Sequence, residues 1–267
     1  MSKYNVHAGH CPQGKGASGA VGFLKESVEN RKVKNEVIRL LRAQKNTAYD
    51  CTCDTKETKS GCLDKIIAKC NQHLVKRDIS IHLNSGRNDK KGDSKPGGVE
   101  VEVYSKKSEA YADAKRIAEE ISKALNIPNR GVNVRTDLAV LRRTKSPAML
   151  IECCFVDDKD DYKRWDAKKC AKAIVKGLTG KEVSSSKLNS KQSYTVIKRT
   201  STKEAIKWLQ KKLNSCYTGK LQNLKVDGIW GSKTQQMLEA YWKQLGWKKG
   251  SYAGTKTCKA LYYNRKK

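Results

Sequence analysis

Short strand-like segments alternate with longer helix-like segments over the first 180 residues, and this alternation constrains the fold more than any other feature. The strand-like segments, which carry alternating or continuous apolar side chains, are residues 4–7, 47–50, 78–84, 98–104 and 148–156. The helix-like segments, in which apolar side chains recur every three or four residues, are 24–41, 63–74, 110–125 and 162–177. This order predicts an α/β domain in which helices flank both faces of a mixed, mostly parallel sheet.

The composition changes near residue 180. Residues 180–193 are rich in Ser, Lys and Asn and show no apolar periodicity, which predicts a linker. Beyond it the pattern is helical, and the motif G-x-K-T-x-x-x-L occurs at 231–238 and again at 254–261. A glycine that ends a loop and a threonine near a helix start fit both copies, so we predict a small all-α bundle. The predicted parts are an α/β domain, a linker and a helical domain, at 1–179, 180–200 and 201–267.

The chain carries a large excess of positive charge. Its 56 Lys and Arg against 27 Asp and Glu give a net charge of +29, which predicts attraction to nucleic acid, an anionic membrane surface or an anionic cell wall. Residues 181–267 hold 20 basic and 4 acidic side chains, so their net charge of +16 makes this part the more densely basic. The lysines are spread out and lack the aromatic motifs of RNA-binding domains, which argues against a specific nucleic-acid partner.

Two further features concern the compartment. No apolar run approaches the roughly 18–20 residues of a membrane span, and residues 1–10 lack a hydrophobic signal core. We therefore expect synthesis in the cytosol without a Sec-type signal, and reduced thiols for the 10 cysteines. The C-T-C at 51–53 and the C-C at 153–154 lack zinc-knuckle spacing, so most cysteines are interpreted as small core side chains.

Two histidines lie where predicted strands end. His10 follows the strand 4–7, and His82 lies near the carboxyl end of the strand 78–84. If these strands are parallel neighbours, both imidazoles lie at the carboxyl edge of the sheet, where α/β proteins bind their ligands. A catalytic zinc ion takes about three protein ligands and keeps one position open, so these histidines and one carboxylate would be sufficient.

Glu26 and Glu29, near the start of the helix 24–41, are the candidate carboxylates. At about 100° per residue both lie near the apolar stripe that contains Val33, and the stripe continues on the side of Glu26. We therefore expect Glu26 to point toward the sheet and to be the third metal ligand, because a buried carboxylate requires a partner. Glu29 is expected to be a capping or surface residue.

Glu152 interrupts the otherwise apolar strand 148–156. A carboxylate among apolar neighbours is costly unless it is paired. At the end of the strand, Glu152 would be placed to act as a general acid or base for water at a metal ion. The structural alternative is an ion pair with an arginine such as Arg142, and the residues alone leave both interpretations open.

Taken together, four segments resemble the zinc-dependent N-acetylmuramoyl-L-alanine amidases of the amidase-3 type, which occur in cell-wall autolysins and phage endolysins. The segments are "HAGH" (7–10), "LKESVEN" (24–30), "SIHLN" (80–84) and "PAMLIECCF" (147–155). The resemblance covers about residues 1–178. It implies an enzyme that uses one Zn²⁺ ion and water to hydrolyse the amide between N-acetylmuramic acid and L-alanine in peptidoglycan.

The resemblance also implies the roles of individual residues. His10, Glu26 and His82 would bind the zinc ion, and Glu152 would be catalytic. His7 stands where members of the family usually carry aspartate, and we expect it to be packed or to support the site rather than to bind zinc. Asn84, two residues past His82, is a weaker candidate for a contact with substrate.

The helical part resembles a second family. Its segments "LQKKLN" (209–214) and "LKVDGIWGSKTQQML" (224–238) are similar to the peptidoglycan-binding type 1 domain, a three-helix module, whose D-G-x-x-G-x-x-T motif is intact. This resemblance implies that a face near Asp227 and Trp230 binds glycan or stem peptide. The alternative, equally open, is that Trp208 and Trp230 fill the core of the bundle.

The combined interpretation is a monomeric, endolysin-like peptidoglycan hydrolase. It would remain in the host cytoplasm until lysis and then act on the cell wall, with anionic wall polymers or the outer membrane as further partners. Two alternatives are kept: a bacterial autolysin or spore-wall amidase with the same chemistry, and a non-enzymatic cationic protein that binds the cell wall.

Overall fold

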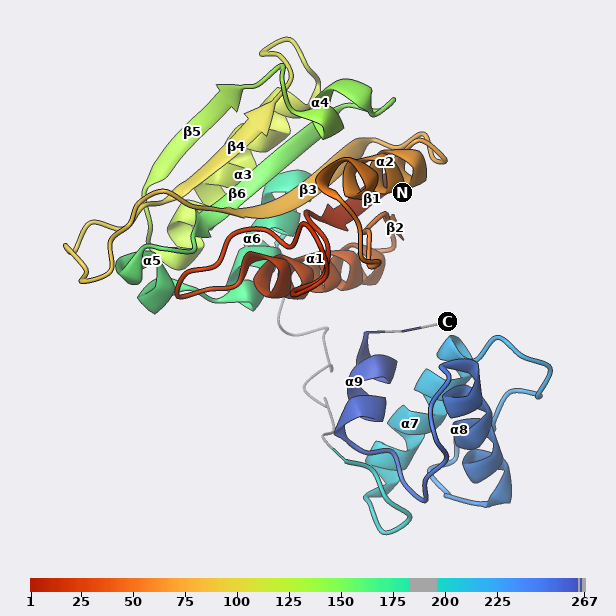
Figure 1. Ribbon diagram of the computed structural model, residues 1–267. Coiled ribbons are helices and arrows are strands. Elements are labelled where there is room, and N and C mark those ends of the chain that lie inside the picture. Colours follow the sequence, from red (N-terminus) through yellow and green to blue (C-terminus); the bar gives the residue numbers. More distant parts are fainter. Residues whose placement is uncertain (183–195, 264, 266–267) are drawn as a thin grey trace. The chain divides into compact units, whose positions relative to one another are not determined.

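The computed structural model describes residues 1–182, 196–263 and 265, and the chain divides into two compact units, 1–183 and 184–267 (Figure 1). Residues 183–195, which make up most of the predicted linker, lie outside the described residues. Within the described part of the chain, none of the helices combines the length and the apolar character that crossing a membrane requires.

A six-stranded sheet forms the centre of the first unit, in the order β2-β1-β3-β6-β4-β5. The strands are β1 (Lys3–Ala8), β2 (Thr47–Asp50), β3 (Arg77–Asn84), β4 (Val99–Val103), β5 (Asn129–Val134) and β6 (Ala148–Phe155). The first three and β6 run parallel, β4 is antiparallel to β6, and β5 is parallel to β4. The predicted mixed, mostly parallel sheet is therefore confirmed. β5 was not predicted, because this edge strand has a polar sequence with no buried side chain.

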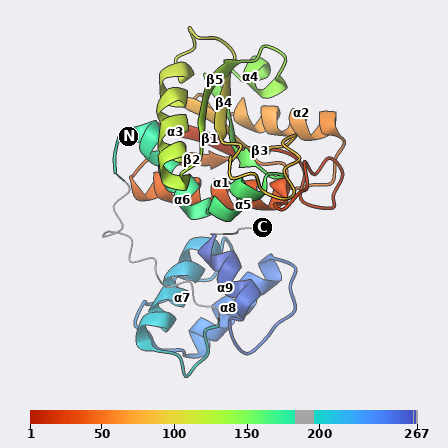
Figure 2. The same ribbon diagram turned by 90° about the vertical axis from the view of Figure 1, so that its left-hand side faces the viewer.

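Helices cover both faces of the sheet, as predicted (Figure 2). The side chains on the two faces of the sheet differ in polarity. The helices of this unit are α1 (Glu26–Ala43), α2 (Lys59–Cys70), α3 (Ala110–Leu125), α4 (Ala139–Arg143), α5 (Lys159–Arg164) and α6 (Ala167–Thr179). α1 and α3 pack against the sheet, and α6 packs against both of these helices. The face beneath them is apolar, with Val6, Ile81 and Ile151 fully buried. Because side chains alternate along a strand, the residues between these point to the other face, toward α2 and α4.

The predicted single helix over 162–177 is wrong, because the chain forms two helices there. α5 ends at Arg164 and α6 begins at Ala167. Asp166 separates them, and its carboxylate accepts hydrogen bonds from the backbone N–H groups of Lys168 and Lys169. Aspartate favours this N-cap position, so the break follows from capping chemistry, which apolar periodicity does not report.

The second unit contains α7 (Lys203–Cys216), α8 (Ser232–Gln244) and α9 (Thr255–Tyr262) among its described residues. Each copy of the repeated motif begins a helix, with Gly231 and Gly254 as extended N-cap residues. The threonine of the second copy, Thr257, is buried and accepts a hydrogen bond from the indole N–H of Trp242 over 2.9 Å. The repeat therefore supplies both the helix starts and polar anchors for the core.

A buried carboxyl in β3 should make the stability of the first unit depend on pH. Burial raises the pKa of Asp78 from 3.8 to about 6, although Asn5 donates a hydrogen bond to its Oδ1 over 2.6 Å. The folded state therefore holds the proton more tightly than the unfolded chain, and this contribution to stability is lost as the pH rises from about 4 to about 6. Asp78→Asn keeps the acceptor for Asn5 and removes the ionisation.

We expect the Asp78→Asn variant to gain stability relative to the wild type over that pH interval, by up to about 3 kcal/mol. Urea unfolding of both full-length proteins at several pH values measures this difference. Equal slopes of unfolding free energy against pH would show that Asp78 ionises in the folded protein as it does in the unfolded chain.

Candidate metal centre

His10, Glu26 and His82 meet at the carboxyl edge of the sheet. β1 and β3 are parallel neighbours, so the loop after β1 brings His10 beside His82, with the ring centroids 4.9 Å apart. His10 Nε2 lies 3.3 Å from Glu26 Oε2, and His82 Nδ1 lies 2.9 Å from Glu26 Oε1. One possible ligand atom from each of the three side chains lies within 4.8 Å of the others. The structure thus brings together the three residues that were predicted to bind a metal.

Glu26 is held in place from several sides. Its side chain is 3% exposed, and the backbone N–H groups of Ala20 and Leu83 donate to its two oxygens over 2.9 and 3.2 Å. Burial alone would raise the pKa of Glu26, but the hydrogen bonds from His10 and His82 lower it well below its usual range. The carboxyl is therefore an anion between two imidazoles, which is the form that binds a cation.

Glu29 is neither a cap nor a surface residue, so that expectation is wrong. It is 9% exposed, and it accepts hydrogen bonds from the Trp165 indole and from Lys32 over 2.9 and 2.5 Å. The tryptophan lies 136 residues away in the sequence, and helical periodicity within α1 carries no information about it.

Glycines in the loop after β1 leave room for the three side chains. A Cβ atom on Gly9 would lie 2.0 Å from the His82 ring, and one on Gly19 would lie 2.5 Å from Glu26 Oε2. His10 itself has a φ of 64°, a left-handed conformation that is uncommon for a residue with a side chain. The glycines of this loop therefore allow the His82 ring and the Glu26 carboxylate to lie close to the backbone.

This packing makes Gly9 a sensitive position. The added methyl group of Gly9→Ala would overlap the His82 ring and push it away from Glu26, so we expect metal affinity to fall at least about tenfold. Gly14→Ala is a control in the same loop. A Cβ there meets nothing within 4 Å, so this variant adds backbone strain at a φ of 73° without a clash with the His82 ring. Metal titration of both variants is the measurement, and equal affinities would contradict the proposed role of Gly9.

Glu152 lies beside the metal candidates on the next strand. It is the direct neighbour of His82 in the parallel pairing of β3 with β6, and of Glu100 in the antiparallel pairing of β6 with β4. Its side chain is partly buried, and its Oε2 is shielded from solvent and has no hydrogen-bond partner among the described residues. Burial, and then the negative charges of Glu26 and Glu100, raise the pKa of Glu152 well above its usual value. No ion pair with Arg142 or another arginine is found for Glu152 in the described part of the chain, so the structural alternative receives no support.

A pocket of about 490 Å³ opens over the polar face of the sheet. His10, His82 and Glu152 line this pocket, and residues of α2 and α4 form part of its wall. Asn84 also lines the pocket, where its side-chain amide donates to Glu100 Oε1 over 2.6 Å. Asn84 therefore faces the cleft, but its amide is engaged with a neighbouring carboxylate.

Three pocket residues were not identified from the sequence. Glu100 and Glu102 project from β4 into the pocket, and Arg135 lies at its wall. Burial raises the pKa of Glu102. The alternation in "GVEVEVY" places both glutamates on one face of a strand. This signal would have been sufficient to assign them to the pocket once β4 was known to lie beside β6.

His7 is packed beneath the centre. It is 1% exposed, its Nδ1 lies 3.7 Å from the Cys70 sulfur, and burial lowers its pKa to about 3. A neutral His7 lines the floor of the pocket outside the group formed by His10, Glu26 and His82.

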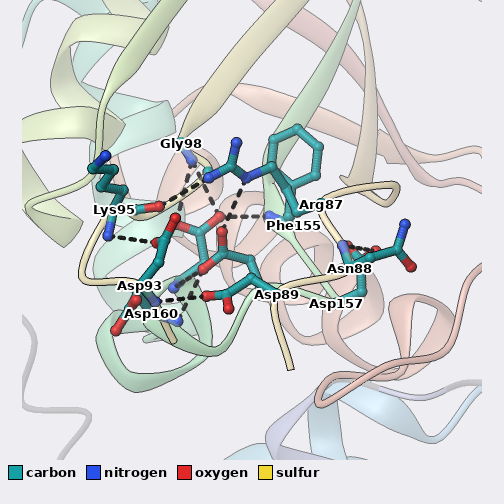
Figure 3. Close-up of polar contacts among 12 residues, drawn as sticks. Arg87, Asn88, Asp89, Asp93, Lys95, Gly98, Phe155, Asp157 and Asp160 are labelled. Atoms are coloured by element: carbon teal, nitrogen blue, oxygen red, sulfur yellow. Dashed lines mark hydrogen bonds and ion pairs between the residues drawn. The ribbon is translucent and has the colours of Figure 1, made fainter. Parts of the chain in front are cut away.

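Aspartates fasten the loop between β3 and β4 (Figure 3). Asp89 accepts from the Gly92 N–H over 2.8 Å, Asp160 accepts from the Ser94 N–H over 2.7 Å, and Arg87 pairs with Asp158 over 3.2 Å. These carboxylates are already used by donors of the protein, so we interpret the cluster as a fastening for the loop.

In the second unit, the predicted wall-binding residues are engaged with their own fold. Trp230 is 7% exposed in the core of the bundle, where Trp208 also packs, and its indole donates to Gln235 over 3.2 Å. Asp227 accepts from the Gln210 side chain and from the Ile229 N–H, each over 2.9 Å. This placement favours the alternative in which the tryptophans fill the core.

An α/β sheet with two imidazoles and a carboxylate together at its carboxyl edge, and a further carboxyl beside them, is an arrangement that metal-dependent hydrolases use. The comparison with known families narrows this class. The N-acetylmuramoyl-L-alanine amidase family matches residues 5–180, and the chain belongs to this family.

The chain is also similar to individual proteins. The chain is 31% identical over 179 residues to an uncharacterized 38.4 kDa protein of Clostridium perfringens, covering 63% of this chain and 50% of the relative. It is 29% identical over 164 residues to the endolysin of Bacillus phage SPP1, covering 58% of this chain and 55% of the relative. The chain spans about half the length of the curated relatives it matches.

Solved structures show the same fold. The catalytic domain of the CD27L endolysin, which targets Clostridia Difficile, superimposes with a TM-score of 0.60 at 26% identity, covering 68% of this chain and 99% of that one. The catalytic domain of the amidase CwlV from Bacillus (Paenibacillus) polymyxa var. colistinus gives a TM-score of 0.55 at 23% identity, covering 67% of this chain and 97% of that one. The latter similarity concerns the fold alone.

Proposed function

We propose that the first unit hydrolyses the amide bond between N-acetylmuramic acid and L-alanine in peptidoglycan, with one zinc ion held by His10, Glu26 and His82. The observation that carries the proposal is the meeting of these three side chains beside Glu152, in a pocket. Membership in the amidase family supports the choice of bond.

The donor set fits a zinc ion. Two imidazole nitrogens and a carboxylate oxygen are typical zinc ligands, and bonds of about 2.0–2.1 Å in a tetrahedron place ligand atoms about 3.3 Å apart. The distance of 3.3 Å between His10 Nε2 and Glu26 Oε2 matches this spacing. A bound zinc ion would supply a Lewis acid for the scissile carbonyl group.

Glu152 supplies the proton transfers in this proposal. Its raised pKa and its unpartnered Oε2 suit a carboxyl that takes a proton from the attacking water and gives it to the leaving amine. The sheet sets the position of Glu152, because the pairing of β3 with β6 places it beside His82. Water thus loses a proton and adds to the carbonyl carbon, the carbon–nitrogen bond breaks, and the amine of L-alanine leaves with that proton.

Digestion of purified peptidoglycan tests this activity. We expect mass spectrometry to find stem peptides with a free N-terminal L-alanine and glycan strands with free lactyl groups. A chelator should stop the release, and added zinc should restore it. Binding without release of peptides would instead identify a non-enzymatic wall-binding protein, and reducing sugar ends without free alanine would identify a glycosidase.

We further propose that the enzyme is an endolysin, which remains in the host cytoplasm until the membrane is opened and then acts on the wall. Sequence similarity to the endolysin of one phage and structural similarity to the catalytic domain of the CD27L endolysin support this role. Expression in a bacterial host tests it. Lysis should require a co-expressed membrane-pore protein, whereas lysis without the pore would favour an exported autolysin.

The second unit is proposed to attach the enzyme to anionic polymers of the wall. Its charge supports this assignment, because residues 181–267 carry a net charge of +16. We expect binding of the catalytically silent Glu152→Gln protein to purified walls to weaken several-fold between about 50 mM and about 500 mM salt, as screening increases. A truncated protein ending at residue 183 should lose most of this salt-dependent binding. Salt-independent attachment would contradict the electrostatic assignment.

A further inference from the structure

Three cysteines that are far apart in the sequence converge on one point beside α2. Cys11 belongs to the loop after β1, Cys53 to the segment after β2, and Cys62 to α2 itself. Their three sulfur atoms all lie within 4.8 Å of one another, and the residues are 0%, 1% and 2% exposed. All three are free cysteines.

The sulfurs have polar surroundings, although apolar side chains enclose the cluster. The Glu57 carbonyl oxygen lies 3.5 Å from the Cys11 sulfur, and the Thr55 hydroxyl lies 3.6 Å from the Cys53 sulfur. The Lys65 ammonium binds the Glu57 carboxylate and the Thr55 hydroxyl, and it interacts electrostatically with Cys53 and Cys11. One positive charge and two oxygen atoms thus lie near the sulfurs of Cys11 and Cys53.

We propose that Cys11, Cys53 and Cys62 bind a thiophilic divalent cation such as Zn²⁺, at a site separate from that of His10, Glu26 and His82. Three thiols give up their protons to solvent and coordinate the ion as thiolates, which zinc prefers in structural sites. A disulfide would use only two of the three sulfurs. Three cysteines and a fourth ligand would complete a tetrahedron, and two oxygen atoms, from the Glu57 carbonyl and the Thr55 hydroxyl, already contact two of the three sulfurs.

The position of the cluster indicates what the cation would do. Cys11 directly follows His10, and the same loop is tied to the segment before α2 through the hydrogen bond from Ala17 N–H to the Glu57 carbonyl. A cation on the three sulfurs would fasten this loop to α2 and so hold His10 in its left-handed conformation. The site is therefore a structural support for the metal centre.

Metal content per chain, measured on protein purified under reducing conditions, tests the proposal independently of enzymatic activity. We expect two equivalents in the wild type, one in Cys62→Ser, one in His82→Ala and none in the double variant. Cys170→Ser is the matched control, because Cys170 is an equally buried thiol outside the cluster on α6, and it should keep both equivalents.

Cobalt substitution keeps the test decisive if Cys62→Ser fails to fold. In His82→Ala, which retains the three cysteines, bound cobalt should show thiolate-to-metal charge-transfer absorption. The same absorption with only one equivalent in the wild type would support the cysteine site while contradicting the histidine site. Absence of that absorption, or a disulfide among the three cysteines found by mass spectrometry of the unreduced protein, would overturn the proposal.

Discussion

Replacing Glu152 with glutamine is expected to lower kcat for peptidoglycan by about 10²–10⁴-fold, with metal content and fold unchanged. Glutamine keeps the shape of the side chain but cannot accept the proton of the attacking water. Glu152 is not a member of the group formed by His10, Glu26 and His82, so its replacement should leave metal binding intact. Release of peptides with free N-terminal alanine from purified walls measures the rate.

Glu102→Gln provides the matched control. Glu102 is another buried carboxyl in the same pocket with a raised pKa, but it pairs with Leu150 rather than with a neighbour of His82. We expect its loss to cost far less in kcat. Similar losses in both variants would indicate that the summed charge of the pocket matters, and would remove the specific proton-transfer role from Glu152.

Replacing Glu26 with alanine is expected to reduce the affinity of the histidine site for zinc by at least about 100-fold. Glu26 is the only carboxylate that the described residues place between His10 and His82, at 3.3 and 2.9 Å from their nitrogens. Its removal leaves the two imidazoles without a carboxylate between them and withdraws the negative charge that attracts the cation. Competition with a chromophoric chelator measures the affinity.

Glu29→Ala is the control for this experiment. Glu29 lies in the same first turn of α1 and is also buried, but it binds Trp165 and Lys32. We expect this variant to lose stability and to keep its zinc affinity. If Glu29→Ala loses zinc as strongly as Glu26→Ala, the loss arises from a displacement of α1 and not from the removal of a zinc ligand.

The sequence was sufficient for most of the fold of the first unit. Five of the six strands have apolar or alternating runs that periodicity detects, and only β5 was missed, because its exposed edge position removes that signal. The break between α5 and α6 also escaped, since the apolar stripe runs across it while the capping aspartate, Asp166, determines the boundary. Periodicity therefore predicted which segments are buried, and it failed where local hydrogen bonds determine the end of a helix.

The convergence of His10, Glu26 and His82 was predictable for a similar reason. The two histidines lie at the carboxyl ends of parallel neighbouring strands, which share one edge of the sheet, and Glu26 begins the helix that follows the first strand. Two other features depend on contacts between distant residues. Glu29 is buried against a tryptophan 136 residues away, and the cysteine cluster brings together positions 11, 53 and 62. No local spacing reports contacts of this kind, which only the folded chain creates.

Anomalous X-ray scattering from crystals of the purified protein, recorded on both sides of the zinc absorption edge, tests the central claim most directly. We predict a zinc peak within bonding distance of His10 Nε2, Glu26 and His82 Nδ1, beside Glu152. Zinc-loaded crystals in which these three side chains stand apart, with no peak among them, would contradict the account.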